Sequence, residues 1–337
     1  MTVPITRKGN APVFPPFKYA NLLDEANFGD WRDELAIHGY VVVKGAVTPE
    51  KALEYRDRAF SWLESFGLGF DRNDESTWKN EHLPVHIKGG MFHGYGIEHE
   101  QFVWDLRTKQ GIIDAFAKLW GTNELVTSFD AGAVMLPHRT DVTDGGKWEH
   151  MDQSPSRVGF YCCQSVINLN ECGPEDGGLM VLRNSSRIVG KYFDEIGRDE
   201  TRTWGPVDWY GFTDAQQEWF YERGCEWVKV EAGPGDLIMW DSRTIHYNVR
   251  PSGDRSRVCT YICMAPAELL SEEDKETRSN AFKLCRGTTH VPFASIYSRE
   301  HQPKLRKGKP CPLDTGIPKE PRRETERVLK LAGILAY

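Results

Sequence analysis

The 337-residue sequence lacks the features that mark several large classes of protein. Its eight cysteines are too few for a disulfide scaffold, and the adjacent pair Cys162 and Cys163 suits neither an ordinary bridge nor a CxxC zinc site. No segment approaches the roughly 20 apolar residues that span a bilayer, and no apolar run follows the charged residues near the N-terminus. We therefore expect a cytoplasmic protein with reduced cysteines and no membrane or secretory segment.

The chain also lacks an excess of basic residues. It has 42 lysines and arginines against 49 aspartates and glutamates, and so a net charge of −7. Binding to a phosphate backbone requires the opposite balance, so a nucleic acid is not expected as a partner. Apolar residues make up 39% of the chain and aromatic residues 12%, which is ample material for a folded core.

The first half of the sequence predicts an arm followed by helices. Residues 1–30 hold four prolines, at positions 4, 12, 15 and 16, and are interpreted as an extended arm. Apolar spacing predicts helices over 31–37, from Thr48 to Gly67, and over 109–120, with a short strand at 40–43. We therefore expect a helical flank over residues 31–124.

From residue 125 onward, short apolar runs alternate with turn residues. The runs cover 125–136, 158–169, 178–183, 226–231, 236–240 and 257–264, and Gly, Pro, Asn and Asp separate them. This rhythm is typical of a β-sandwich or barrel. We expect one domain over residues 1–337, with a β-core over 125–266 and a C-terminal extension over 267–337.

Three segments fit this plan less well. A stretch rich in Gly and His at 82–99 and an aromatic insertion at 197–224 are each long enough to form a lid, although packing of an extra helix explains the insertion equally well. Residues 299–330 hold ten basic and five acidic residues, which more often indicates a solvated tail than a binding patch.

The strongest chemical signal is the motif His150-Met151-Asp152 together with His246. Side chains alternate along a strand, so His150 and Asp152 would face the same side. His246 follows the apolar run 236–240, and a folded β-core could bring it opposite the pair. Two imidazoles and one carboxylate form the facial triad that binds non-haem Fe(II) and leaves its other face open. A bare His-x-Asp is common, so this interpretation depends on its context.

Arg257 supplies that context. It begins the apolar run 257–264, where a strand would carry its guanidinium into the core. A buried arginine needs an anion, and its planar fork suits a carboxylate, so a dicarboxylate bound at one end to iron would satisfy it. Arg255 would lie on the same face by alternation and is the competing candidate. We favour Arg257 because it begins the apolar run.

Taken in order, these motifs resemble the phytanoyl-CoA dioxygenase family of Fe(II)/2-oxoglutarate-dependent oxygenases. The resemblance covers roughly residues 35–266 and rests on Gly39-Tyr40-Val41-Val42-Val43, His150-x-Asp152, the run 177–186, Gly235-Asp236, His246 and Arg257. It implies a mainly β fold, a double-stranded β-helix (a jelly roll, as in cupins) with flanking N-terminal helices. It also implies Fe(II) on His150, Asp152 and His246, with 2-oxoglutarate held by Arg257 and dioxygen as the other co-substrate.

The sequence departs from the family pattern in places. Glu149 separates Trp148 from His150, and Asn248 stands where the family has a small polar residue that contacts 2-oxoglutarate. The implied reaction is hydroxylation of an unactivated C–H bond, with desaturation or ring closure as variants and with release of succinate and carbon dioxide. Two alternatives remain open: a cupin-type metalloenzyme that does not use 2-oxoglutarate, and a non-catalytic binding protein on the same fold.

The substrate can be predicted only as a class. The candidate contacts mix apolar and polar groups, which suits a small organic molecule of specialised metabolism with an apolar body and one polar or anionic handle. Ordinary core packing or a solvated loop explains the same residues about as well. These candidates are Gln164, Tyr161, Trp240, Arg139 and Tyr261.

Overall fold

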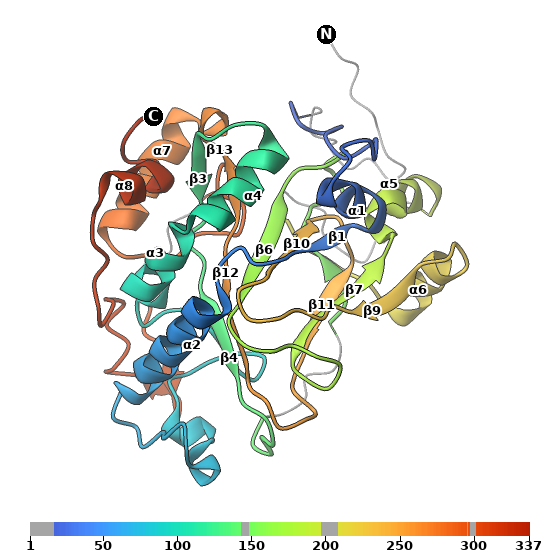
Figure 1. Cartoon of the computed structure of the whole chain (residues 1–337). Helices are drawn as coiled ribbons and strands as arrows, with labels where there is room; N and C mark the ends of the chain where they lie inside the picture. The colour runs from blue at the N-terminus through green and yellow to red at the C-terminus, as the bar shows by residue number, and fades with distance from the viewer. Residues whose placement is uncertain (1–16, 143–147, 197–207, 295, 297–300) are drawn as a thin grey trace.

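The computed structural model describes residues 17–142, 148–196, 208–294, 296 and 301–337. Its β-core consists of two antiparallel sheets that face each other (Figure 1). The larger sheet has the order β1-β10-β6-β12-β4-β2 and the smaller one β8-β5-β11-β7-β9. Within the described chain the two sheets do not join into a closed barrel, so the mainly β, double-stranded β-helix fold is confirmed in an open form.

The strands that form these sheets are short, and most are buried. In the larger sheet they are β1 (Tyr40–Val43), β2 (Met91–Phe92), β4 (Gly132–Met135), β6 (Cys163–Asn168), β10 (Leu237–Asp241) and β12 (Arg257–Tyr261). In the smaller sheet they are β5 (His150–Met151), β7 (Gly178–Arg183), β8 (Tyr210–Gly211), β9 (Glu226–Lys229) and β11 (His246–Val249). Two further pairs join β3 (Leu125–Thr127) with β13 (Met264–Pro266) and β14 (Leu305–Arg306) with β15 (Lys309–Pro310).

Helices cover the outer faces of both sheets (Figure 1). The larger sheet is flanked by α2 (Pro49–Glu64), α3 (Gln101–Arg107), α4 (Gln110–Trp120), α7 (Glu272–Lys283) and α8 (Glu326–Ala332), and the smaller sheet by α5 (Ser185–Glu195) and α6 (Asp214–Tyr221). Helix α1 (Trp31–His38) leads directly into β1. None of the described helices has the length and apolar character needed to cross a membrane.

Three apolar clusters follow from this layering. The largest lies between the helices and the larger sheet, and another joins α5 and α6 to the smaller sheet. The third fills the space between the sheets with side chains from β4, β6, β7, β10 and β12, including Val181, Trp240 and Cys259. We call this third cluster the interior. Of the candidate substrate contacts, Trp240 belongs to it and Tyr261 packs against it.

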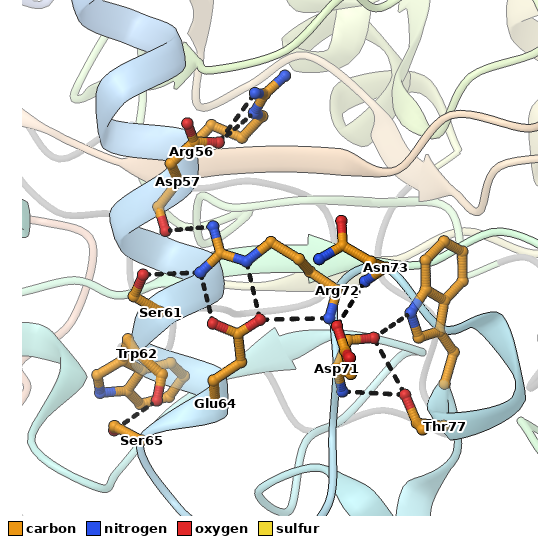
Figure 2. Close-up of polar contacts among 11 residues, drawn as sticks. Arg56, Asp57, Ser61, Trp62, Glu64, Ser65, Asp71, Arg72, Asn73 and Thr77 are labelled. Carbon is orange, nitrogen blue, oxygen red and sulfur yellow. Dashed lines mark hydrogen bonds and ion pairs between the residues drawn. The ribbon is translucent and has the colours of Figure 1, made fainter.

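Local sequence explains why α2 starts and stops where it does. Thr48 caps its N-terminus by accepting a hydrogen bond from the Lys51 N–H, and Pro49 occupies the first turn. Beyond its C-terminus, Arg72 folds back onto the helix (Figure 2). Its guanidinium donates to both carboxylate oxygens of Glu64, at 2.8 and 2.6 Å, and to Ser61 Oγ at 2.7 Å. This bidentate pair fixes the loop that follows the helix.

The structure confirms most of the predicted elements and corrects others. The apolar run 125–136 is divided into β3 and β4, and the run 257–264 into β12 and β13. Helices α3 and α5 were not predicted. The interpretation of residues 299–330 as a solvated tail holds only in part: most of the described residues 301–330 are exposed, but others pack into the fold. The Asp314 side chain there is fully buried, and the Arg322 guanidinium lies 3.5 Å from the ring centre of Phe282.

The predicted arm and insertion fall partly outside the described residues, which omit 1–16 and 197–207. From Phe17 onward the arm packs on the fold, because the Phe17 ring stacks on Phe293 at 5.5 Å. The described part of the insertion forms β8 and α6, and Phe212, Trp219 and Phe220 are buried beside α5. The segment 82–99 likewise packs into the core through Phe92 and Tyr95.

Candidate metal centre

His150, Asp152 and His246 meet in one place, as the sequence predicts. One ligand atom from each lies within 4.8 Å of the others. His150 and His246 are directly opposite each other on β5 and β11, with ring centres 4.3 Å apart, and Asp152 follows the last residue of β5. The two histidines are buried. Two imidazoles and one carboxylate at this spacing could hold a metal ion.

The hydrogen bonds of both imidazoles suit a metal site. His150 Nδ1 lies 2.8 Å from the carbonyl oxygen of Trp148, and His246 Nδ1 lies 2.9 Å from that of Thr244. Because a carbonyl oxygen only accepts, each Nδ1 must carry a proton, and in a neutral ring this leaves the lone pair on Nε2. His150 Nε2 lies 3.4 Å from Asp152 Oδ1, and His246 Nε2 lies 3.4 Å from Asp152 Oδ2. Ligating histidines are typically held in this way.

The charges at the site also match the needs of a cation. Burial alone would raise the pKa of Asp152, but the neighbouring His150 and His246 lower it well below its ordinary value. Burial and the adjacent His150 lower the pKa of His246. A carboxylate that stays ionised beside an imidazole that stays neutral is the protonation state in which both groups bind a metal.

The turn before β11 delivers His246 to this position. Arg243 pairs with Asp241 at 2.6 Å, and the Thr244 hydroxyl donates to the carbonyl oxygen of Gly39 at 2.7 Å. Gly39 has a φ of 81°, and a Cβ there would lie 2.5 Å from the Thr244 hydroxyl oxygen. Only glycine allows both the backbone conformation and the close approach. The Gly39 that precedes the entry strand therefore supports the turn that carries a metal-ligand candidate.

Arg257 and Arg255 lie in different surroundings. Arg257 begins β12, is 3% exposed, and has Met135 Sδ at 3.9 Å as a weak acceptor. No carboxylate of the described residues pairs with it. Arg255 lies before the strand and binds Asp176 through Nε at 3.0 Å and Nη2 at 2.7 Å. The interior guanidinium is therefore the one that remains available to an anion, as the sequence favoured.

Several buried polar atoms near the triad lack a hydrogen bond within the described structure. The buried atoms without a hydrogen bond include Gln164 Oε1, Trp240 Nε1, Asn248 Oδ1 and the Tyr261 hydroxyl oxygen. Asn248 shares a face of β11 with His246, and the Trp240 ring lies 5.4 Å from that of His246. Buried polar atoms are normally hydrogen-bonded, so a polar ligand bound beside the triad could satisfy several of these.

Two predicted substrate contacts are not brought to the triad. Tyr161 lies in the outer cluster, with its ring 5.1 Å from both Phe17 and Phe293. Arg139 binds Asp141 at 2.6 Å and Asn80 at 2.9 Å. Neither forms a hydrogen bond or ion pair with the triad among the described residues. The strand alternation assumed for Tyr161 fails because β6 begins only at Cys163.

The structure adds aromatic residues beside the triad that the sequence did not assign to the site. The Trp148 ring stacks on His150 at 4.4 Å with an angle of 13° between the planes, and Lys88 Nζ lies 4.4 Å from the Trp148 ring centre. Trp209 lies 6.1 Å from His150 at 25° and is 50% exposed. The aromatic content of the insertion was the available signal for Trp209. No sequence signal places Lys88 on Trp148.

The C-terminal extension also reaches the site. His290 Nε2 lies 3.2 Å from the carbonyl oxygen of Asp152, a contact between residues far apart in the sequence. A bond to the main chain of a metal-ligand candidate restrains the position of that residue. The extension is therefore part of the structure that holds the site in place.

Comparison with known proteins identifies relatives of this chain. The family model described as phytanoyl-CoA dioxygenase matches residues 36–259. "Ava biosynthesis cluster protein O" of Aspergillus versicolor is 41% identical over 278 residues, which cover 82% of this chain and 90% of the relative. A Dictyostelium discoideum protein named for the same dioxygenase is 21% identical over 290 residues, or 73% and 78% of the two chains.

A solved structure of a Salmonella typhimurium LT2 protein shares the fold. It superposes with a TM-score of 0.61 at 14% identity, and the match covers 94% of this chain and 85% of that one. At this identity the likeness concerns the fold alone.

Proposed function

This chain belongs to the phytanoyl-CoA dioxygenase family of Fe(II)/2-oxoglutarate-dependent oxygenases, and we propose that His150, Asp152 and His246 hold its iron while Arg257 binds 2-oxoglutarate. When bound, iron in this class uses dioxygen and 2-oxoglutarate to oxidise a C–H bond of a second substrate, with release of succinate and carbon dioxide. The donor set fits the ion, since two imidazoles and one ionised carboxylate converge.

The observation that carries the assignment of 2-oxoglutarate is the buried guanidinium of Arg257. The triad by itself also suits a cupin-type metalloenzyme that does not use 2-oxoglutarate, but such an enzyme gives no reason for a buried arginine that has no carboxylate partner among the described residues. Burying a charge without a partner is costly, whereas a carboxylate on Arg257 would form a bidentate pair. Asn248, which shares a face with His246, is proposed as a second polar contact to 2-oxoglutarate.

We propose that the second substrate is a small organic molecule with a planar or aromatic part. The half-exposed Trp209 lies beside His150, and a flat apolar group could stack on it. Lys88, above Trp148, adds a positive charge that suits an anionic or polar handle. The name of the 41% identical relative places that protein in a biosynthetic gene cluster, which supports a role for this chain in specialised metabolism.

Two matched arginine variants test the binding of 2-oxoglutarate. We expect Arg257→Ala to weaken binding to the Mn(II)-loaded protein by about 2–4 kcal/mol, the cost of removing one partner of a buried charge pair. Arg255→Ala removes a guanidinium that is already paired with Asp176, so it should have much less effect. Isothermal titration with 2-oxoglutarate measures both. Equal affinities in wild type and Arg257→Ala would refute the assignment.

A further inference from the structure

The carboxylate of Asp152 is held by a glutamine. Gln164 lies near the start of β6, opposite Trp240 on β10, and is 5% exposed. Its Nε2 lies 2.8 Å from Asp152 Oδ2. Because an ionised carboxylate only accepts hydrogen bonds, the NH₂ group of the amide must be the end that faces it. The sequence predicted Gln164 as a substrate contact, and the structure shows that its amide also donates to Asp152.

This contact differs from those that hold the two histidines. Their Nδ1 atoms are bound to main-chain carbonyl oxygens within two residues of each ring, so the local backbone fixes both imidazoles. Asp152 lies beyond the end of β5, and its main chain is bound to Ser242 and His290. Its side chain has no comparable main-chain donor among the described residues. The orientation of the carboxylate therefore depends on the Gln164 amide.

We infer that Gln164 is a positioning residue that binds Asp152 Oδ2 and so fixes the orientation of the carboxylate toward the metal. The inference rests on the proposed iron site. Oδ1 lies 3.4 Å from His150 Nε2 and Oδ2 lies 3.4 Å from His246 Nε2, so the amide holds the carboxylate where its oxygens face both histidines. A carboxylate held in this way would meet a bound metal in one orientation. Without the amide the carboxylate could rotate away from that orientation.

The test is Gln164→Met, which preserves side-chain length and removes the donor. Loss of the group that orients a metal ligand typically weakens metal binding by about ten- to a hundredfold. We expect a decrease of that size for Co(II), measured by isothermal titration of the full chain. The visible absorption spectrum of the Co(II) protein should also change, because its band intensities report the coordination number. Gln164→Asn, whose amide is one methylene shorter, should behave in the same way and decides the question if the methionine variant does not fold.

Gln101→Met is the matched control. Gln101 is also buried, and its Nε2 donates to Asp105 at 2.6 Å on α3, away from the triad. The same chemical change there should leave Co(II) affinity and spectrum unaltered, even where it lowers stability.

A second control separates this inference from the proposed function. If His246→Ala binds Co(II) as tightly as wild type, the triad itself is wrong. If His246→Ala loses Co(II) but the folded Gln164 variants keep the affinity and spectrum of wild type, the iron site stands and the positioning role of Gln164 is overturned.

Discussion

Trp209 is an exposed tryptophan that its neighbours hold firmly in place. On one side Asp208 accepts hydrogen bonds from Arg157 Nε at 2.7 Å and from the Ser154 N–H at 3.0 Å. On the other side Gly211 pairs with His150, and a Cβ at Gly211 would lie 2.7 Å from the Trp209 ring. The ring therefore has a fixed position at the edge of the metal centre. Such a side chain can stack on a ligand at little entropic cost.

This geometry leads to a prediction for substrate binding. Trp209→Ala should weaken binding of an aromatic substrate by about 0.5–1.5 kcal/mol, the range for one aromatic pair, and leave 2-oxoglutarate binding unchanged. The KM values for the two co-substrates, measured with the best compound of a small-molecule screen, provide the comparison. A rise in the KM for 2-oxoglutarate alone would show that Trp209 supports the metal site and does not contact the substrate.

At the scale of single residues, the sequence predicted that His150, Asp152 and His246 converge, because these distinctive side chains stand at positions that strand alternation can interpret. The role of Arg257 stays a prediction. The contact between Gln164 and Asp152 could not be predicted, because it depends on how β6 lies relative to the end of β5. The same tertiary geometry places Tyr161 in the outer cluster, away from the triad.

At the scale of helices and strands, the predictions were correct where an apolar run and the turn residues that bound it lie within one short segment. The strand β7 spans Gly178–Arg183, and the predicted run has the same bounds. Helix α3 was missed because it is buried on most sides and no side chain caps its N-terminus, so it shows neither an apolar stripe nor a start signal. Helix α5 was missed because only Asn184 separates it from β7, no side chain caps its N-terminus, and it begins with two serines.

The C-terminal extension is attached to the core through Asp314. This buried carboxylate accepts hydrogen bonds from the Tyr95 N–H at 2.8 Å and from the Lys304 N–H at 2.9 Å. Asp314→Ala would leave both donors without an acceptor, and we expect it to lower the free energy of unfolding by about 2–4 kcal/mol. Urea denaturation measures the loss. Asp24 is exposed, so Asp24→Ala serves as the control. If both variants lower the free energy of unfolding by a similar small amount, Asp314 does not attach the extension to the core.

At the scale of the whole molecule, a buried carboxyl should make stability depend on pH. Burial raises the pKa of Glu98 to about 7, from an ordinary value of 4.5 that the unfolded chain would show. Between these values the folded state holds a proton that the unfolded state has released. This contribution to stability is therefore fully present below about pH 4.5 and is lost as the pH rises through 7.

Glu98→Gln tests this dependence, because glutamine stays neutral at every pH. Its side-chain oxygen can still accept the hydrogen bond that the Gly94 N–H donates to Glu98 Oε1 at 2.8 Å. At pH 8 the variant should be more stable than wild type by about 1–3 kcal/mol, and near pH 5 the difference should largely vanish. Urea denaturation at the two pH values gives the comparison. A difference that does not change with pH would show that Glu98 is not protonated in the folded state.

At the proposed metal centre, iron, 2-oxoglutarate and dioxygen would act together on a small molecule. The most direct test is succinate formation from 2-oxoglutarate by the Fe(II)-loaded protein in air, with a panel of small aromatic metabolites. We predict that succinate depends on Fe(II) and dioxygen, increases with at least one compound in proportion to its oxidation, and is lost in His246→Ala. Conversion of a compound without succinate would contradict the account and favour a cupin-type enzyme that does not use 2-oxoglutarate.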